Sequence, residues 1–528
     1  MRGKILMALM VLMAMACSKE GPSSNRDLDY EYGRRLSHDM IVLGNRLENP
    51  YKTENISKAV AALYPTKADR VDVRTTDLYV RFLPSSQEEY DALTSLGLRM
   101  MDHPMDYSIA VEGDWYHDPE IPEGDITWQY CVVPADFVFP DIRYEIIDEC
   151  YISENNTTTR SDDGIDWDKV ERQAYIMTGN EDMLPPDTKA SATYDPERPK
   201  GRITIEDKHF NAGNPIGVAG VKVSCNAFVK YDDTYTDESG YFEMSKKFNT
   251  DVRYRLIFEN KKKFSIGFNL ILVPASVSTL GKSSPAGINM TVTKDSEDKL
   301  FKRCAVNNAV YDYITRCASG DLDITPPPTR LRIWIFHNLN ASSAVMMHHG
   351  AALDMEMIKS FLGEYAVLVK LFLPDLTIGA KDTDDYREIY SLTCHELAHA
   401  SHFAEVNEEY WNEYILYIIK SFITSGGITY GDGTEDGAGY CEVGEMWAYY
   451  MESLMYKSRY GGDFPTYGNS FWFKPEIFRY LHKRGLTCSD IFSVLDEDVD
   501  SRKDLEKALI AAFPTKRTQI EQAFDKYR

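Results

Sequence analysis

The spacing of hydrophobic residues changes once along this chain, and that change limits the folds available to it. Across residues 201–292, apolar and polar residues alternate in short runs such as GRITIED and VRYRLIFEN, separated by Gly, Asn and Asp. Period-two runs of this kind predict the strands of a small antiparallel sandwich. After Thr293 the period becomes helical, as in KLFKRCAVNNAVYDYITRC. The pattern therefore predicts a multidomain α+β fold, in which a β-rich segment precedes a mainly helical one.

The length of 528 residues agrees with several domains, because a single core rarely grows beyond about 250–300 residues. Before the sandwich, LSHDMIVLGNRL is amphipathic and predicts a helix, whereas DLYVRFLP alternates like a strand. Polar runs rich in Asn, Thr and Pro then indicate a linker around one short helix. The predicted order is an N-terminal α/β domain at 27–152, a linker at 153–199, a β-sandwich at 200–295 and a helical domain at 296–528.

The balance of charge excludes one class of partner. The chain has 58 Lys and Arg against 82 Asp and Glu, which gives a formal net charge of -24. Nucleic-acid binding requires a basic surface, so no nucleic-acid partner is expected. The cysteines form no CxxC pair, which excludes a zinc ribbon or a thioredoxin-type site.

The first residues predict export. Arg2 and Lys4 precede an apolar run at residues 5–16, which ends in MAMACSKE. A basic start followed by a short apolar run predicts a signal peptide, and the run is too short to span a bilayer.

The end of that run resembles a bacterial lipobox, because Cys17 directly follows the small residue Ala16. With the SKE that follows, it is similar to the export signals of Bacteroidetes surface lipoproteins. The resemblance implies a signal peptide at 1–17, lipidation of Cys17, a polar tether at 18–26 and a location on the bacterial outer membrane, exposed at the cell surface. The alternative is a plain secreted protein in which Cys17 is incidental.

The segment SLTCHELAHASHF carries the strongest indication of chemistry. On a helix, His395 and His399 lie one turn apart on one face, so both imidazoles can reach one cation. Zinc accepts neutral imidazole and keeps a position open when only three protein ligands bind it. Glu396 can then take a proton from water as the water attacks a carbonyl. The alternative is a core helix with structural histidines.

A third histidine in the same segment does not complete this site. His402 lies seven residues after His395, about 10.5 Å along a helix axis. A tetrahedral ion with bonds of about 2 Å cannot bridge that distance together with His399. His402 is therefore predicted to pack in the core or to contact substrate.

A carboxylate from a later helix is the expected third ligand. The segment GYCEVGEMWAYYMES offers Glu442, Glu445 and Glu452. Because Gly444 is a poor residue for a helix interior, the helix is predicted to begin near Glu442. Glu445 would then lie in the first turn, which makes it the favoured ligand, with Glu442 next. Weaker alternatives are the loop carboxylates Asp432 and Asp436.

The stretch Glu445-Met-Trp-Ala resembles the segment that supplies the zinc carboxylate in several gluzincin peptidases. The resemblance implies a zinc-dependent endopeptidase in which His395, His399 and Glu445 hold Zn²⁺ and Glu396 is the general base. The chain departs from the thermolysin-like pattern at Tyr449, where an aspartate that orients a histidine would stand.

Such an enzyme also requires a group that stabilises the oxyanion of the tetrahedral intermediate. Tyr440 is the predicted stabiliser, and Tyr430 and His402 are the alternatives.

The order GRITIE, NPIGVAGVKVSC and TYTDESGYFEM resembles the carboxypeptidase-regulatory-like, transthyretin-type domain, which implies an accessory module. The whole layout is similar to surface lipoprotein metallopeptidases of gut Bacteroidetes. That likeness implies a protein or glycoprotein substrate. The alternative function is a non-catalytic surface binding or adhesion lipoprotein with a structural or vestigial zinc site.

Overall fold

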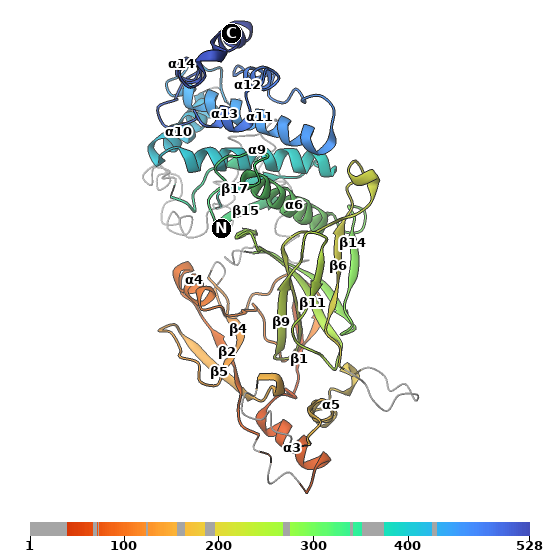
Figure 1. Ribbon diagram of the computed structural model, residues 1–528. Helices are drawn as coiled ribbons and strands as arrows, with labels where there is room; N and C mark the ends of the chain where they lie inside the picture. The colour runs from red at the N-terminus through yellow and green to blue at the C-terminus, as the bar shows by residue number, and fades with distance from the viewer. Residues whose placement is uncertain are drawn as a thin grey trace.

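The chain folds into an elongated molecule with three regions (Figure 1). In this computed structural model, the described residues are 40–66, 71, 73–122, 125–155, 164–184, 196–267, 275–337, 342–350, 374–424 and 430–528. Helices contain 36% of the residues and strands 22%, as expected for an α+β protein. An N-terminal region lies at one end, β-sheets occupy the middle, and a helical layer forms the other end.

The N-terminal region holds two small antiparallel sheets, one of three strands in the order β4-β2-β5 and one formed by β1 and β3. Buried side chains lie on both faces of β2, since Tyr79 belongs to one hydrophobic cluster and Val80 and Phe82 belong to another. The elements of this region are β1 (Val42–Arg46), α3 (Thr53–Leu63), β2 (Asp77–Phe82), α4 (Gln87–Ser95), β3 (Tyr107–Val111), β4 (Gln129–Pro134) and β5 (Tyr144–Cys150). After them, the predicted linker contains α5 (Trp167–Met177), which is its expected short helix.

The predicted helix in LSHDMIVLGNRL is wrong for its described residues, because β1 pairs with β3. The close approach of the two strands explains the difference. A Cβ atom at Gly44 would lie 2.4 Å from Oγ of Ser108, so any larger residue there would have to displace that hydroxyl. Tertiary pairing therefore overrides the amphipathic pattern, while residues 36–39 lie outside the described residues.

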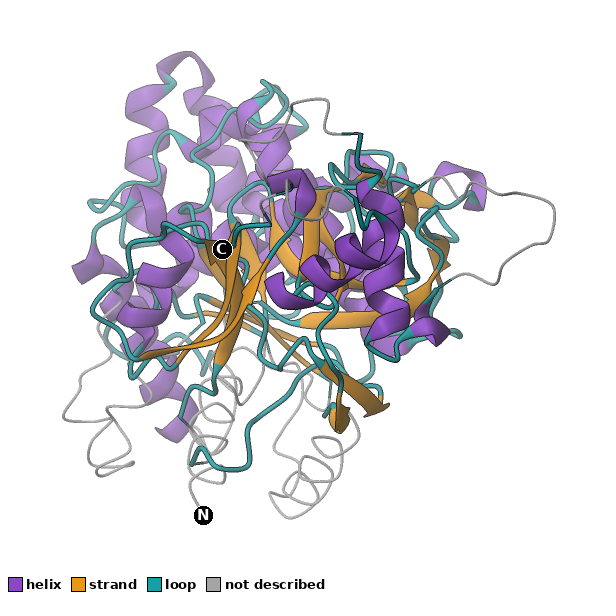
Figure 2. Cartoon of the chain, turned by 90° about the horizontal axis from the view of Figure 1, so that it is seen from below, coloured by secondary structure: helices purple, strands orange, loops and turns teal. Residues whose placement is uncertain are grey.

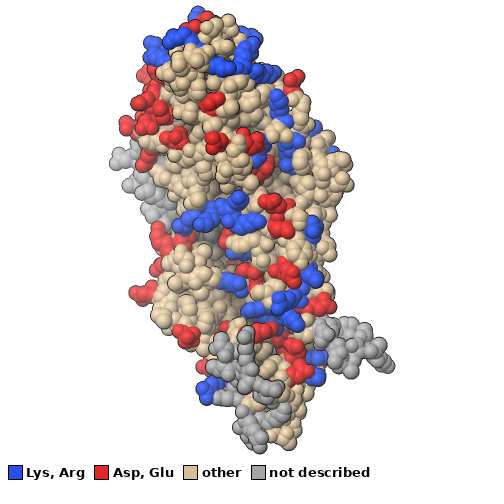
Figure 3. Space-filling view, in the orientation of Figure 1, with Lys and Arg blue, Asp and Glu red and all other residues tan. Residues whose placement is uncertain are grey.

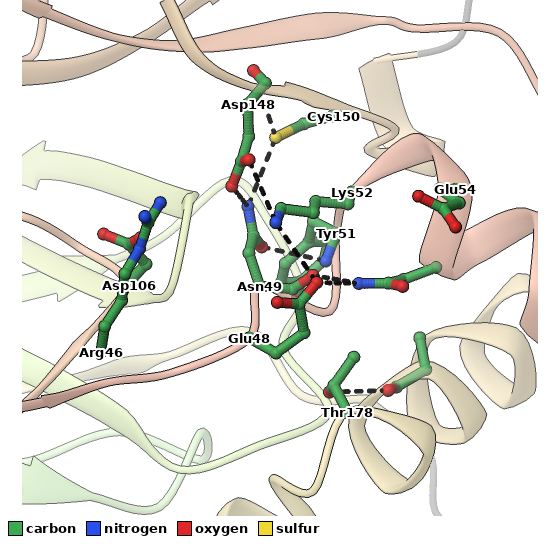
Figure 4. A network of polar contacts seen from close by, with 12 residues as sticks. Arg46, Glu48, Asn49, Tyr51, Lys52, Glu54, Asp106, Asp148, Cys150 and Thr178 are labelled. Atoms are coloured by element: carbon green, nitrogen blue, oxygen red, sulfur yellow. Dashed lines mark hydrogen bonds and ion pairs between the residues drawn. The ribbon is translucent and has the colours of Figure 1, made fainter.

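A polar network fixes the turn between β1 and α3 (Figure 4). Nδ2 of Asn49 donates a hydrogen bond of 3.2 Å to Oδ2 of Asp148, and Nζ of Lys52 lies 3.3 Å from Oδ1 of the same carboxylate. Nearby, Nε of Arg46 donates to Oδ2 of Asp106 at 2.7 Å. These contacts join the start of α3 to β5 and the end of β1 to the residues before β3.

The middle region consists of a four-stranded sheet and an eight-stranded sheet. The first has the order β10-β6-β14 with β7 beside β6, and the second has the order β16-β17-β15-β12-β11-β8-β9 with β13 beside β11. The predicted sandwich is not wholly antiparallel, because β6 and β14 are parallel. The strands are β6 (Lys200–Ile205), β7 (Ile216–Gly217), β8 (Val221–Ala227), β9 (Lys230–Tyr235), β10 (Tyr241–Glu243), β11 (Val252–Asn260), β12 (Phe264–Ile266), β13 (Val277–Ser283), β14 (Asn289–Val292), β15 (Leu331–Phe336), β16 (Ser343–Ala344) and β17 (Leu376–Gly379).

The larger sheet crosses the boundary predicted at residue 295. β12 lies before that boundary and β15 after it, and the two strands pair in parallel with Phe264 opposite Leu331. One hydrophobic core extends from Ile203 in β6 to Phe524 near the C-terminus. The two segments predicted as separate domains therefore share a sheet and a core.

The helical layer covers one end of the larger sheet (Figures 1 and 2). Helix α9 packs against β16, β17 and α6, and it also packs against α11, so it lies between the sheet and the outer helices. The predicted helices after Pro475 are present as four short ones. The helices are α6 (Asp298–Ala318), α9 (Tyr386–Glu405), α10 (Glu408–Thr424), α11 (Ala438–Tyr460), α12 (Glu476–His482), α13 (Cys488–Phe492), α14 (Arg502–Ala512) and α15 (Arg517–Lys526).

The surface mixes both signs of charge. Figure 3 shows acidic and basic side chains interspersed over one face, with Lys and Arg gathered in a band at mid-height. Among the helices of the described residues, none is both long and apolar enough to cross a bilayer.

Candidate metal centre

Helix α9 presents the two histidines of the HExxH segment on one face. The helix begins after Asp385, whose side chain accepts a hydrogen bond from the backbone N–H of Arg387 and so caps the first turn. His395 and His399 are buried, at 4% and 0% exposed, and their ring centroids lie 4.9 Å apart. The one-turn spacing therefore brings both imidazoles to the same place, as predicted.

Glu445 of α11 meets these histidines. Oε2 of Glu445 lies 3.5 Å from Nε2 of His395, and Oε1 lies 3.5 Å from Nε2 of His399. The register of the two helices is fixed nearby, where Nε1 of Trp447 donates a 3.0 Å hydrogen bond to the carbonyl of Ala398. One ligand atom from each of His395, His399 and Glu445 lies within 4.8 Å of the other two.

The buried atoms of this group fit a metal ion. Nε2 of His399 and Oε2 of Glu445 have no hydrogen-bond partner within the described part of the chain, although both residues are fully buried. Buried polar atoms are normally satisfied, so orphaned atoms that converge on one point indicate a missing partner. Two imidazole nitrogens and a carboxylate oxygen can hold a metal ion here.

The electrostatics of the site also favour a positive charge at its centre. Burial by itself raises the pKa of a carboxyl group, but His399 and His395 hold the pKa of Glu445 well below its usual range. Burial likewise lowers the pKa of a histidine, yet Glu445 and Glu452 raise the pKa of His395 to about 10. In His399 burial dominates and lowers the pKa. The carboxylates thus favour a cation between the helices.

Two side chains orient the candidate ligands, and neither role was predicted. Oε2 of Glu452, on α11, lies 3.3 Å from Nδ1 of His395, which leaves Nε2 of that ring facing Glu445. The hydroxyl of Tyr414, on α10, donates a 2.8 Å hydrogen bond to Oε1 of Glu445. Partners of this kind fix the rotamer of a metal ligand and tune its basicity. The seven-residue spacing from Glu445, two helical turns, was the indication in the sequence that Glu452 shares its face.

Glu396, the predicted base, follows His395 on α9 and is 1% exposed. After burial, which lowers the pKa of His395, and Glu445 and Glu452, which raise it, the charge of Glu396 also raises it. A carboxylate beside the ligands is where a general base for water is required.

His402 packs among aromatic rings instead of joining the group. Its ring centroid lies 5.3 Å from that of Tyr410 and 6.1 Å from that of Trp411. Burial lowers the pKa of His402 to about 3, so the ring is neutral. This position agrees with the predicted packing role.

Glu442 and Tyr440 lie outside the metal group. Nε of Arg502 donates a 2.6 Å hydrogen bond to Glu442, so that carboxylate is occupied by another partner. The ring of Tyr440 packs 4.8 Å from that of Tyr410, and burial and the charge of Asp500 raise the pKa of its hydroxyl.

The contacts of Tyr440 in the described structure include none of the three metal ligands, and its role as oxyanion stabiliser stays a prediction. Tyr430 and Asp432 also have contacts of their own. Tyr430 packs against Phe471, and Asp432 accepts a hydrogen bond from the hydroxyl of Thr434.

Comparison with known proteins adds no relative. No protein-family model, no curated protein and no solved structure matches this chain.

Proposed function

We propose that the chain is a zinc-dependent endopeptidase of gluzincin type that acts on extracellular proteins or glycoproteins. The observation that carries the proposal is that the carboxylate of Glu445 lies beside the imidazoles of the two histidines that flank Glu396. Two imidazoles and one carboxylate form a ligand set that suits zinc and leaves a fourth position for water or substrate. A purely structural site has no need for a carboxylic acid between its histidines.

In this proposal each residue of the site has a separate role. When bound, zinc supplies a Lewis acid that polarises the scissile carbonyl and makes water a better nucleophile. Glu396 takes the proton of the attacking water and returns it to the leaving amine. Glu452 holds the ring of His395, and Tyr414 holds the carboxylate of Glu445, so that neither ligand has to reorient during turnover.

The decisive experiment compares wild type with Glu396→Gln on a mixed extracellular proteome, with the new N-termini sequenced. The Gln variant keeps the volume of the side chain and removes its basicity, so zinc content should stay equal while cleavage falls by about 10²-fold or more. Equal cleavage by both proteins removes Glu396 from the mechanism. Zinc in both without cleavage by either contradicts the peptidase.

One observation favours a second function, a surface binding protein with a structural metal site. All three ligands are at most 4% exposed, and burial of that degree is typical of a closed structural site. The same pair of proteins separates the two functions, because a structural site predicts bound zinc and no cleavage with any substrate in the mixture.

The location of the protein is also a proposal, since residues 1–39 lie outside the described residues. We propose that Cys17 is lipidated and anchors the chain to the bacterial outer membrane. Cys17→Ser should abolish labelling by a radioactive fatty acid and move the protein from the membrane fraction to the soluble one. Labelling of the Ser variant at the wild-type level would refute the anchor.

A further inference from the structure

A cavity of about 290 Å³ lies between the N-terminal region and the eight-stranded sheet. The sheet contributes Ser224, Asp233 and Arg255, which form one row across three strands because Arg255 pairs with Ser224 and Ser224 with Asp233. Asp102 and His103 line the facing wall. In the strand order this part of the sheet is at the opposite end from β16 and β17, on which α9 packs, so the cavity is separate from the metal centre.

Arg255 is the unusual group in this cavity. Its side chain lines the cavity and is 6% exposed, yet it has no ion pair with a carboxylate of the described residues. Its single hydrogen bond within the described structure runs from Nη2 to Nε2 of His103 at 2.8 Å, and Nε has no partner there. A guanidinium has five N–H donors, and a buried one without an anionic partner is costly.

The partner of Arg255 does not supply the missing charge. Burial and the guanidinium of Arg255 lower the pKa of His103 to about 4, so the ring is neutral at physiological pH. Nδ1 of His103 lies 2.7 Å from Oδ1 of Asp102, which leaves Nε2 as the acceptor for Arg255. Asp102 therefore stabilises the charge of Arg255 from a distance, without a direct ion pair, and burial still lowers the pKa of the guanidinium.

We propose that this cavity binds a small organic molecule that carries one carboxylate or sulfate group, with Arg255 as the anion-binding residue. A planar guanidinium pairs with such oxyanions through two parallel hydrogen bonds. Met101, Ile257 and Tyr231 form an apolar part of the wall for the rest of the molecule. Two carboxylates of the lining already have cationic partners, since Asp233 pairs with Arg99 and Glu259 with Lys222. The volume is close to the lower end of small-molecule sites, which begin at about 300 Å³.

The first experiment is a calorimetric titration of the exported chain with acetate, glucuronate and sulfate at constant ionic strength. Wild type should bind at least one probe saturably, and Arg255→Met should bind it at least about tenfold more weakly, because a charge-assisted pair is lost. Arg253→Met is the matched control. Arg253 is on the same strand, but its guanidinium is already paired with Glu112 at 2.9 and 3.1 Å, so its loss should leave affinity unchanged.

A second variant decides the matter if Arg255→Met does not fold. Ser224→Asp places a carboxylate opposite Arg255 in the register, so it should raise the melting temperature without a probe and abolish probe binding. Wild-type affinity in Ser224→Asp, or in a folded Arg255→Met, overturns the proposal, and so does the failure of all three probes to bind wild type saturably. Zinc content should be the same in every variant, because the metal centre lies elsewhere.

Discussion

At the scale of single residues, Glu452 determines how His395 presents its ligand atom. Its carboxylate lies 3.3 Å from Nδ1 of the ring, so it favours the ring orientation in which Nε2 faces Glu445. We expect Glu452→Gln to weaken zinc binding about 10- to 100-fold, as measured by competition with a chromogenic chelator.

Glu442→Gln is the matched control for that measurement. Glu442 is on the same helix and pairs with Arg502, so its loss should lower stability slightly and leave zinc affinity unchanged. Equal zinc affinity in Glu452→Gln and wild type would show that the contact with His395 has no part in metal binding.

The sequence could predict those site residues whose geometry depends on one helix. His395 and His399 required only the helical period. Glu445 was chosen among three carboxylates by its resemblance to the gluzincin segment and by a helix start near Glu442, whereas α11 begins at Ala438. The roles of Glu452 and Tyr414 depend on how α9, α10 and α11 pack, which no local pattern contains. The sequence therefore supported Tyr440 as the catalytic tyrosine, whereas the hydroxyl that contacts a ligand belongs to Tyr414.

At the scale of elements, the start of α11 shows why packing overrides propensity. Gly444 predicted a helix beginning near Glu442, but α11 begins at Ala438 and runs through the glycine. A Cβ atom at Gly444 would lie 3.2 Å from the ring of Tyr414 and 4.0 Å from Cε1 of His399. The glycine thus allows α10 and α9 to approach α11, and its cost in helix propensity, about 1 kcal/mol, is offset by that packing.

Two glycines with the same positive φ test the packing behind the site. Both Gly468 and Gly461 have φ of +77°, but a Cβ at Gly468 would lie 2.6 Å from the ring of Tyr449, while none of the other described residues comes within 4 Å of one at Gly461. Tyr449 in turn contacts His395 at 4.4 Å between ring centroids.

Alanine at either position strains the backbone by roughly 1–3 kcal/mol, because a residue with a Cβ atom disfavours a positive φ. Gly468→Ala should also displace Tyr449, lose about 1–3 kcal/mol more in urea unfolding, and weaken zinc binding. Equal losses of stability in the two variants would contradict this role for Tyr449.

The proposed metal would join α9 to α11, so its removal should loosen the two helices from each other. A ligand that binds the folded state alone stabilises it, by about 4 kcal/mol when its free concentration is about 1,000 times its Kd. Wild type treated with a chelator should therefore melt several degrees lower, and added zinc should restore the melting temperature. His399→Ala is the control, since it lacks a ligand and should melt at one temperature with or without chelator. An unchanged wild type would mean that no metal links the helices.

At the scale of the whole molecule, the sequence predicted which segments are helices and which are strands better than it predicted the domain boundaries. The short strands of residues 201–292, the strand at β15 and the long helices α6 and α9 follow from local periodicity. The pairing of β12 with β15 joins residues more than 60 positions apart, and no local pattern specifies it. The boundary placed at residue 295 therefore divides a continuous sheet.

That continuity predicts how parts of the chain behave alone. Residues 296–528 lack β12, which leaves an edge of β15 unpaired, and they also lack β6, β11 and β14, against which α6 packs. An exposed apolar helix face and a free strand edge promote association. We expect residues 296–528 to elute as aggregates in size-exclusion chromatography and to lack a cooperative melting transition.

Residues 196–528 retain the sheet and the core and should melt in one transition as a monomer. A monomeric 296–528 fragment that melts cooperatively and binds zinc would instead show that the helical layer folds independently. In that case the pairing of β12 with β15 is a contact between two autonomous domains, and the boundary at residue 295 is correct.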